Sequence, residues 1–392
     1  MSKLYIDFIG AIPSGNVKVH GGANYVKSIL LSIMDNPVYC ENVCVLWPLG
    51  YSPWEADEIR IRQSDKLTFM DIAELDENTP IEEGSSIFFP LIRTRRWNIF
   101  AQCKQWYQNV KVYATLHDIR LLDMIPDAKD GYYVAREKNR LYSNIQYMIK
   151  SFAYKRIQKK YVQYVDKIYT DSNYSLQGLK KITPNANITV HYLTCTVDSI
   201  VESERKIKEK FILFVSAGRK EKNFVRALEA FSVYKSKYPD ELYMHAVGID
   251  DEVLQSMIQG NHAIDAAIIQ KYVVTYSYVE KDMLNTLYSE CEYLLYLSRS
   301  EGFGLPVLEA AKHGKPSVAS NATSIPEVLG NAIEYVNPYR IDSIVQGMCA
   351  IKKNYALDTA LVQERIKASE IMYQCDMKKL LNDLFDGIID GE

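Results

Sequence analysis

The chain has 392 residues, more than one ordinary hydrophobic core accommodates, so its length predicts two or three domains. Hydrophobic residues make up 47% of the chain and charged residues 24%, which excludes an intrinsically disordered protein. A net charge of −3 gives no general attraction to nucleic acid, which we exclude as a partner. The cysteines form no CxxC pair and no cluster with histidine at metal-ligand spacing, and no window approaches the ~20 apolar residues of a membrane span. These features predict a cytoplasmic protein without a zinc site.

Short β-branched or aromatic runs alternate with amphipathic helical stretches along the chain. This alternation predicts parallel sheets covered by helices. The predicted strands are Leu4–Ile9, Val43–Trp47, Ile87–Phe89, Lys111–Thr115, Lys167–Thr170, Ile188–Val190, Phe211–Val215, Tyr243–Val247, Tyr272–Tyr276, Tyr293–Leu297 and Ser317–Ala319.

A charged stretch, Asp198–Lys210, suits a linker, and the series of strands restarts directly after it. We therefore predict a first domain over residues 1–197 and a second domain over residues 210–369. In sheets of this kind ligands bind outside the carboxyl ends of the strands. The loops that follow the strands are therefore the candidate sites.

Two loops of the first half contain candidate residues. The first predicted strand leads into a glycine-containing loop that opens a helix at Gly21 and Gly22, without the GxGxxG pattern of dinucleotide-binding proteins. The strand Lys111–Thr115 leads into His117. A lone histidine is more often a core or surface residue with satisfied hydrogen bonds than a functional one. The chemistry of histidine alone therefore does not decide the role of His117. Further on, Asp171 or Ser172 is expected to cap a helix.

Residues 134–165 form a basic segment in which apolar residues are interleaved. Such a surface suits an anionic membrane or a lipid diphosphate acceptor, and a solvated helix face explains the same pattern equally well. Against one acidic residue, Glu137, the segment carries Arg136, Lys138, Arg140, Lys150, Lys155, Arg156, Lys159 and Lys160. A second small basic cluster consists of Arg93, Arg95 and Arg96 beside Trp97.

The strongest signal is the run EGFGLPVLEA at residues 301–310. Gly302 and Gly304 allow the backbone to approach a ligand closely, and Pro306 suits the first turn of a helix. The N–H groups of this loop would then form a phosphate-binding helix N-terminus. Glu309, about one turn into that helix, suits a ribose that donates two hydrogen bonds, or it stabilises the dipole of its own helix.

With Glu301 and Glu309 separated by seven residues, this run closely resembles the signature of family 4 glycosyltransferases. The resemblance covers most of residues 4–332. It implies the GT-B fold, an α/β architecture of two Rossmann-like domains with parallel sheets that face each other across a cleft. It also implies that a C-terminal helix, about residues 370–392, packs back on the first domain.

The resemblance implies transfer of a sugar from a nucleotide diphosphate sugar to a hydroxyl acceptor, with retention of the anomeric configuration and without a metal or cofactor. The absence of a DxD motif agrees with metal independence. In the segment after Phe211–Val215, Arg219 and a lysine are expected to clamp the diphosphate, because fixed cations stabilise charge on a departing group. The lysine is Lys222 or Lys220, and Lys222, beside Asn223, is preferred. The alternative for this segment, without the resemblance, is a solvated charged turn.

The remaining roles follow from the same resemblance. Glu301 is expected to bind sugar hydroxyls, Glu309 the ribose, and His117 the reaction centre. The residues expected to contact the donor mainly through their backbone are Gly21, Gly22, Gly302, Phe303, Gly304, Leu305 and, beside the base, Tyr278.

We therefore expect a glycosyltransferase with a nucleotide-sugar donor and a glycan or lipid-linked glycan acceptor, acting in polysaccharide or lipid-linked oligosaccharide assembly. Its basic surface is a candidate for peripheral contact with the inner face of a membrane. Two alternatives stay open: a sugar-nucleotide-binding protein without activity, and another GT-B enzyme such as an epimerase or a phosphorylase. The presence of Arg219, Glu301, Glu309 and His117 favours transfer.

Overall fold

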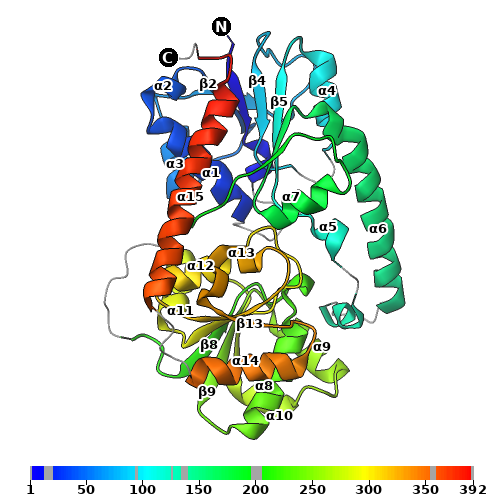
Figure 1. Ribbon diagram of the computed structural model, residues 1–392, viewed down its shortest axis with the longest axis vertical. Helices are drawn as coiled ribbons and strands as arrows, with labels where there is room; N and C mark the ends of the chain where they lie inside the picture. Colours follow the sequence, from blue (N-terminus) through cyan, green and yellow to red (C-terminus); the bar gives the residue numbers. More distant parts are fainter. Residues whose placement is uncertain are drawn as a thin grey trace. The chain divides into compact units, whose positions relative to one another are not determined.

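The structure is a computed structural model that describes residues 2–12, 21–92, 96–124, 127–133, 140–195, 205–353 and 359–389. The chain divides into two compact units (Figure 1). The first unit comprises Met1–Ile119, Ala153–Leu193 and Met372–Glu392. The second unit comprises Arg120–Phe152 and Thr194–Ile371.

The first unit is built on a seven-stranded parallel sheet in the order β3-β2-β1-β4-β5-β6-β7. Its strands are β1 (Leu4–Asp7), β2 (Val43–Pro48), β3 (Thr68–Ile72), β4 (Ser86–Phe89), β5 (Lys111–Leu116), β6 (Lys167–Thr170) and β7 (Ile188–Val190). Its helices are α1 (Gly21–Met34), α2 (Pro37–Cys40), α3 (Ala56–Arg62), α4 (Ile99–Trp106) and α7 (Asn173–Lys180), with 3-10 turns at Ile9–Ala11 and Val162–Tyr164. Two long helices, α6 (Arg140–Tyr161) and α15 (Thr359–Phe385), contain residues of both units.

The second unit is built on a six-stranded parallel sheet in the order β10-β9-β8-β11-β12-β13. Its strands are β8 (Lys210–Phe214), β9 (Leu242–Val247), β10 (Val273–Tyr276), β11 (Tyr293–Tyr296), β12 (Ser317–Ser320) and β13 (Glu334–Val336). Its helices are α5 (Arg120–Asp123), α8 (Phe224–Lys237), α9 (Asp251–Gly260), α10 (Ala266–Tyr272), α11 (Lys281–Glu290), α12 (Leu305–Lys312), α13 (Ile325–Leu329) and α14 (Ile341–Lys353), with 3-10 turns at Ala128–Tyr133, Lys220–Lys222 and Gly330–Ala332.

Central strands of both sheets are apolar and buried, because parallel sheets are covered on both faces. All four residues of β1, of β4 and of β11 are buried. In the second unit the core also includes α8, where the ring of Phe224 lies 4.8 Å from that of Phe214 on β8. The two Rossmann-like parallel sheets confirm the predicted α/β fold class.

All of the predicted strands are present, and among the described residues the sequence missed β3 and β13. Each of these two strands lies at an edge of its sheet. An edge strand pairs on one side only and carries polar or exposed residues, such as Thr68 and Asp71 in β3 and Glu334 in β13. Neither strand therefore shows the continuous apolar run by which the central strands were recognised.

The division of the chain differs from the predicted one at Arg120–Phe152, which was assigned to the first domain and groups with the second unit. Ion pairs within the second unit hold this segment: Asp127 with Arg226 at 2.8 Å, Asp130 with Arg299, and Lys129 with Glu229. Most of the predicted linker Asp198–Lys210, as far as residue 204, lies outside the described residues.

The C-terminal part of α15 contacts the sheet and helices of the first unit. The Asp383 carboxylate lies 2.5 Å from Lys167 Nζ and accepts a hydrogen bond of 3.0 Å from the Tyr169 hydroxyl, both from β6. The ring of Phe385 stacks on Tyr39 with centroids 4.5 Å apart. Because the Tyr169 side chain is buried, Asp383 satisfies a group that water does not reach freely.

We expect Asp383→Ala to lower the free energy of unfolding by about 1–3 kcal/mol, because it leaves the buried Tyr169 hydroxyl without its acceptor. The matched control is Asp386→Ala, which removes an exposed partner of Lys111 and is expected to cost less than about 1 kcal/mol. Urea unfolding of the full chain measures both values. Equal losses would show that Asp383 does not anchor the helix.

Candidate functional site

The candidate site of the second unit lies where the strand order reverses. From β8 the sheet runs to β9 and β10 on one side, and from β11 it runs to β12 and β13 on the other. Ligands of doubly wound sheets bind at the carboxyl ends of the strands at this switch point. The loops after β8 and β11 contain the residues that the sequence predicted, and the structure joins them: Lys222 Nζ lies 2.5 Å from Glu301 Oε1.

The loop after β8 is compact because its backbone makes unusual turns. Ser216 and Asn223 adopt left-handed conformations with φ of 58° and 68°. At Gly218, a side chain would place its Cβ 2.5 Å from the carbonyl oxygen of Gly248, so only glycine fits there. The loop ends in the 3-10 turn Lys220–Lys222, which directs Lys222 into the protein.

Lys222 and Glu301 form a buried ion pair. Lys222 Nζ also donates to the Tyr296 hydroxyl at 2.9 Å, and the Ser298 hydroxyl donates to Glu301. Burial favours the neutral carboxyl, but Lys222 and Ser298 outweigh it and hold the Glu301 pKa below its usual value. Glu301, the predicted sugar ligand, is therefore ionised, and its contact with Lys222 holds both side chains in fixed positions.

Glu221 organises a second group of charges in the same loop. Its buried carboxylate accepts hydrogen bonds from Arg219 at 2.7 Å and from Arg120. Burial would raise the Glu221 pKa, but Arg219 and Arg120 lower it to about 2. The backbone carbonyl of Glu221 accepts from Arg299 N at 2.8 Å, which ties the loop to the one after β11.

The sequence analysis assigned no role to Glu221 or Arg120. Glu221 lies between two lysines, and a sequence with this pattern is typical of a solvated charged turn. Arg120 is 99 residues before Arg219, and no local pattern connects them. Only the fold shows that one carboxylate positions two guanidinium groups, of which Arg219 is 52% exposed and accessible to a ligand.

The loop after β11 presents backbone donors. Gly304 has φ of 120°, which only glycine adopts readily, and it directly precedes α12, which has Pro306 in its first turn. The Ser324 hydroxyl donates to the carbonyl oxygens of Glu301 and Phe303 and fixes the loop. In the described part of the chain, the N–H groups of Gly302 and Gly304 have no hydrogen-bond acceptor. Such groups at a helix N-terminus bind anions.

Glu309 lies on the first turns of α12, where it accepts a hydrogen bond of 2.7 Å from the Tyr288 hydroxyl. Burial raises the Glu309 pKa. Tyr288 is itself held by stacking on His313, with ring centroids 5.6 Å apart. This arrangement fixes one carboxylate oxygen, and the other keeps capacity to accept from a ligand hydroxyl.

Tyr278 takes no part in the described contacts that join the loops after β8 and β11. It follows β10, which is separated from β8 by β9, and its hydroxyl donates to Glu280 at 3.3 Å. Its ring is 44% exposed. The role of Tyr278 beside a base stays a prediction.

In the first unit, His117 follows β5 and is held on both ring nitrogens. Nε2 donates to the Pro90 carbonyl oxygen after β4 at 2.8 Å, and Nδ1 lies 2.9 Å from Asp171 after β6. Burial lowers the His117 pKa, but the charge of Asp171 outweighs it and raises the pKa. A sugar hydroxyl would therefore have to replace Pro90 to bond the ring, and the role of His117 at the reaction centre stays a prediction.

The neighbours of His117 also settle two smaller expectations. Ser172 caps α7 by accepting from Ser175 N at 3.2 Å, which confirms the predicted serine cap. Asp171 instead orients His117, a role that the sequence did not indicate for it.

Gly21 and Gly22 are the first residues of α1, and the part of their loop at residues 13–20 lies outside the described residues.

Comparison with known proteins agrees with this geometry. Residues 198–368 match the family model of the glycosyl transferases group 1. The chain is 28% identical over 193 residues to the O-antigen chain mannosyltransferase B of Escherichia coli, which covers 45% of this chain and 49% of that protein. It is also 28% identical over 148 residues to the serotype-specific mannosyltransferase WbdA of Escherichia coli, covering 37% of this chain and 18% of that protein. The match therefore spans about half of the first relative's length and less of the second's.

Solved structures show the same fold at low identity. Sucrose-phosphate synthase from Thermosynechococcus elongatus has a TM-score of 0.65 and 14% identity, covering 99% of this chain and 100% of that one. A glycosyltransferase from Rickettsia africae has a TM-score of 0.63 and 14% identity, with 100% of both chains covered. The chain thus has the GT-B fold. Within this fold, residues 198–368 resemble the glycosyl transferases group 1.

We predict that Glu221→Gln changes stability in a pH-dependent way. Since the folded pKa of Glu221 lies below its unfolded value, its contribution is present above pH 4.5 and is lost as the pH falls from 4.5 towards 2. The wild type should exceed the variant by about 3 kcal/mol in free energy of unfolding at neutral pH, and this difference should shrink through that window.

Denaturant unfolding at a series of pH values measures the difference. Glu252→Gln, which changes an exposed glutamate in the first turn of α9, is the control and should give no such trend. A pH-independent difference for Glu221→Gln would contradict the ionised, guanidinium-bound carboxylate.

Proposed function

We propose that the chain is a retaining glycosyltransferase that moves a sugar from a nucleotide diphosphate sugar to a hydroxyl of a growing glycan. The proposal rests on one observation: at the switch point of the second unit, cationic side chains and backbone N–H groups without an acceptor come from two neighbouring loops of the described chain. Arg219 and Lys222 come from the loop after β8, and the N–H groups of Gly302 and Gly304 from the loop after β11. Together they suit a diphosphate.

The mechanism proposed for this site is substitution on one face of the sugar. The bond between the anomeric carbon and the diphosphate oxygen breaks with its electron pair going to the diphosphate. The acceptor hydroxyl oxygen bonds the same carbon from the same side, and its proton passes to the departing diphosphate oxygen. Fixed cations lower the barrier because negative charge grows on the diphosphate during the step.

Glu301 has a defined part in this proposal. In the structure its carboxylate compensates Lys222. When a diphosphate takes Lys222 as its counter-ion, the carboxylate is available to accept hydrogen bonds from sugar hydroxyls. The site would thus exchange an internal ion pair for two ligand contacts. The transfer needs neither a metal nor a cofactor in this proposal, since protein cations supply the charge.

The relatives suggest which sugar to try first. Both of the Escherichia coli proteins above are named as mannosyltransferases, and one of them as an O-antigen chain enzyme. We therefore propose a mannosyl donor and a polysaccharide acceptor, with a lipid-linked glycan as the alternative acceptor.

We expect one nucleoside diphosphate, or its sugar, to stabilise the wild type selectively, by about 2.7 kcal/mol at a hundredfold excess over its dissociation constant. Arg219→Ala and Glu309→Gln should lose this stabilisation, because they remove a diphosphate and a ribose contact. Thermal unfolding with a panel of nucleoside diphosphates and their mannose derivatives measures it.

Matched controls are Arg340→Ala, an exposed arginine paired with Asp342, and Glu252→Gln. Both should keep the full stabilisation. If no nucleotide stabilises the wild type, the proposed donor site is wrong. If a nucleotide sugar binds but no acceptor is glycosylated, the binding protein without activity is the better account.

We also propose that α6 lies on an anionic membrane surface. The helix spans 22 residues, contains six basic residues and no acidic one, in a chain whose net charge is −3. Ile145, Met148, Ile149 and Phe152 follow the i, i+3, i+4, i+7 spacing of one helix face and are between 46% and 64% exposed.

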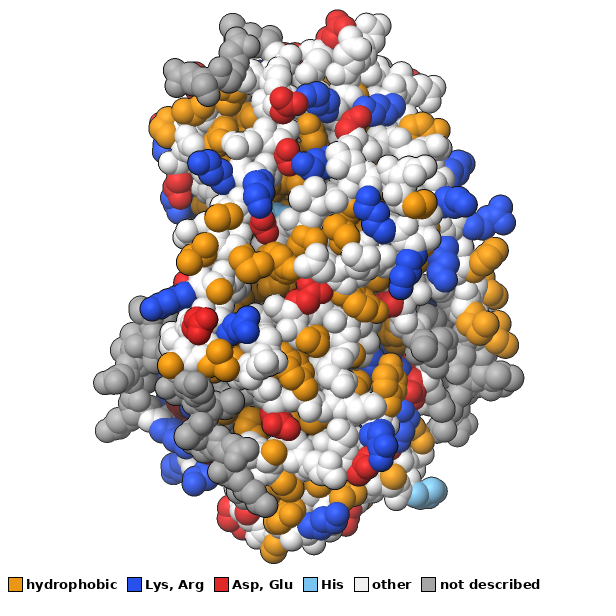
Figure 2. Space-filling model, in the orientation of Figure 1, with side chains coloured by type: hydrophobic (Ala, Val, Ile, Leu, Met, Phe, Trp, Pro, Cys, Tyr) orange, Lys and Arg blue, Asp and Glu red, His pale blue; other side chains and the backbone are white. Residues whose placement is uncertain are grey.

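The same face of α6 becomes basic further along the helix. Lys155, Arg156, Lys159 and Lys160 are all exposed. In Figure 2, basic side chains gather at the right-hand edge above apolar ones, where Figure 1 draws α6. An exposed apolar stripe beside clustered lysines is typical of a helix that lies in the interface of an anionic bilayer. No helix in the described ranges is both long and apolar enough to cross a membrane.

The wild type should bind vesicles that contain phosphatidylglycerol and not vesicles of phosphatidylcholine alone, and salt should weaken binding because it screens the charges. Met148→Ser with Phe152→Ser should reduce binding at least about tenfold, since the apolar insertion is lost. Cosedimentation at low salt measures this. The control pair is Ile371→Ser with Met372→Ser, two exposed apolar residues of α15. Equal binding to both vesicle types, or an equal loss in the control, would contradict the proposal.

A further inference from the structure

One crossover of the first unit has no helix. The chain passes from β3, at the edge of the sheet, to β4 on the far side of β1 through an extended segment, residues 73–85. Parallel strands are usually joined by a helix that covers the sheet. Here a loop replaces it, and a groove of about 910 Å³ remains between β3, this loop and α4.

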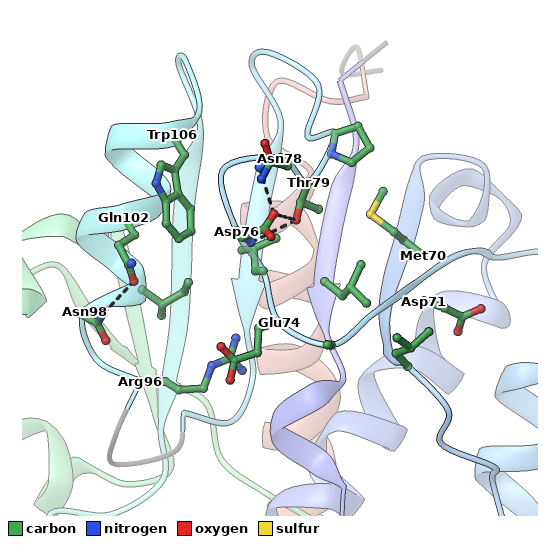
Figure 3. A pocket seen from close by; sticks show the side chains of 16 residues that line it. Met70, Asp71, Glu74, Asp76, Asn78, Thr79, Arg96, Asn98, Gln102 and Trp106 are labelled. Carbon is green, nitrogen blue, oxygen red and sulfur yellow. Dashed lines mark hydrogen bonds between the residues drawn. The ribbon is translucent and has the colours of Figure 1, made fainter.

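Two walls of the groove differ in chemistry. One wall is α4 with the residue before it, and Figure 3 shows Asn98, Gln102 and Trp106 following one another along it. The other wall is the crossover loop, on which Figure 3 shows Asp76 and Thr79 next to each other. Thr79 and the N–H of Asn78 donate to the Asp76 carboxylate at 3.0 Å, so the loop has a fixed shape.

The charge of the lining excludes an anionic ligand. Glu74 and Asp76 contribute carboxylates, a third carboxylate, Asp71, is paired with Arg62 at 2.8 Å, and Arg96 is the cation among the lining residues. Arg96 is already held by the buried Asp7 carboxylate, 3.3 Å away. A phosphate or a nucleotide would therefore meet net negative charge.

The wall along α4 offers paired donors and acceptors. Asn98 Nδ2 donates to Gln102 Oε1 at 2.8 Å. This bond leaves the Gln102 NH₂ as a donor and Asn98 Oδ1 as an acceptor towards the groove. Each hydroxyl of a sugar both donates and accepts a hydrogen bond. A neighbouring amide donor and amide acceptor can therefore bind sugar hydroxyls. Beside them, the partly exposed indole of Trp106 provides a flat apolar surface for the C–H face of a sugar ring.

We propose that this groove binds a short, uncharged oligosaccharide segment of the acceptor glycan. Its volume lies within the ~300–1,000 Å³ of sites that enclose a ligand of drug size, which suits a short oligosaccharide. None of its lining residues has a part in the proposed transfer step, so the groove takes a portion of the glycan that does not react. The identity of the ligand as acceptor rests on the proposed function, whereas the groove as a sugar site does not.

The test is direct binding of trisaccharides of mannose, of glucose and of N-acetylglucosamine to the full chain, by titration calorimetry or saturation-transfer NMR, without any donor. We expect one of them to bind. Trp106→Ala should weaken binding about tenfold and Gln102→Ala about fivefold, because they remove the apolar platform and a hydrogen-bonding amide. Gln105→Ala, an exposed residue of the same helix that does not line the groove, should leave binding unchanged.

Three outcomes would overturn the proposal: no trisaccharide binds at millimolar concentration, binding is the same in all variants, or a trilysine peptide binds and the sugars do not. Thermal unfolding checks that Trp106→Ala is folded, and Gln102→Ala keeps the test valid if it is not. Nucleoside diphosphate stabilisation is measured on the same samples. If no nucleoside diphosphate stabilises the wild type, the proposed donor site is wrong, but the proposed sugar site in the groove is not affected. The two failures are therefore distinguishable.

Discussion

The carboxylate of Glu221 is the interaction on which the candidate donor site depends. It is buried, ionised and shared by two guanidinium groups, while its backbone carbonyl joins the loop after β8 to the loop after β11. A buried charge is tolerable only when it is paired and hydrogen-bonded, so this carboxylate fixes the arginines as firmly as they stabilise it. Next to it, Lys222 and Glu301 form the second pair. The site is thus a set of charges held in place before any ligand arrives, which is the arrangement that electrostatic stabilisation of a departing diphosphate requires.

Much of the fold was predictable because its signals are local. The apolar runs of β1, β8 and β11 are continuous, since both faces of these strands are buried. The EGFGLPVLEA run was informative for the same reason: glycine, proline and the two glutamates act within one loop and one helix turn. The structure brings Lys222 next to Glu301, a contact that the sequence did not indicate, and the ligand roles of both residues stay predictions.

What the sequence did not indicate depends on contacts between distant residues. Glu221 bonds Arg120 across about a hundred positions, and His117 bonds Asp171 across 54. The membership of Arg120–Phe152 in the second unit also follows from ion pairs with residues such as Arg226 and Arg299, which no periodicity shows. Edge strands β3 and β13 escaped detection because polar residues such as Thr68, Asp71 and Glu334 interrupt their apolar pattern.

The central claim is that the chain transfers a sugar with retention, and the product tests it most directly. Incubation with a nucleotide diphosphate mannose and a mannose-terminated oligosaccharide, followed by ¹H NMR of the product, reads the configuration at the new anomeric carbon. The account predicts one nucleoside diphosphate released for each glycosidic bond formed, with the configuration of the donor retained. An inverted product would contradict the front-face mechanism. If the nucleotide sugars of a full panel bind and none is transferred, the claim of catalysis itself would be wrong.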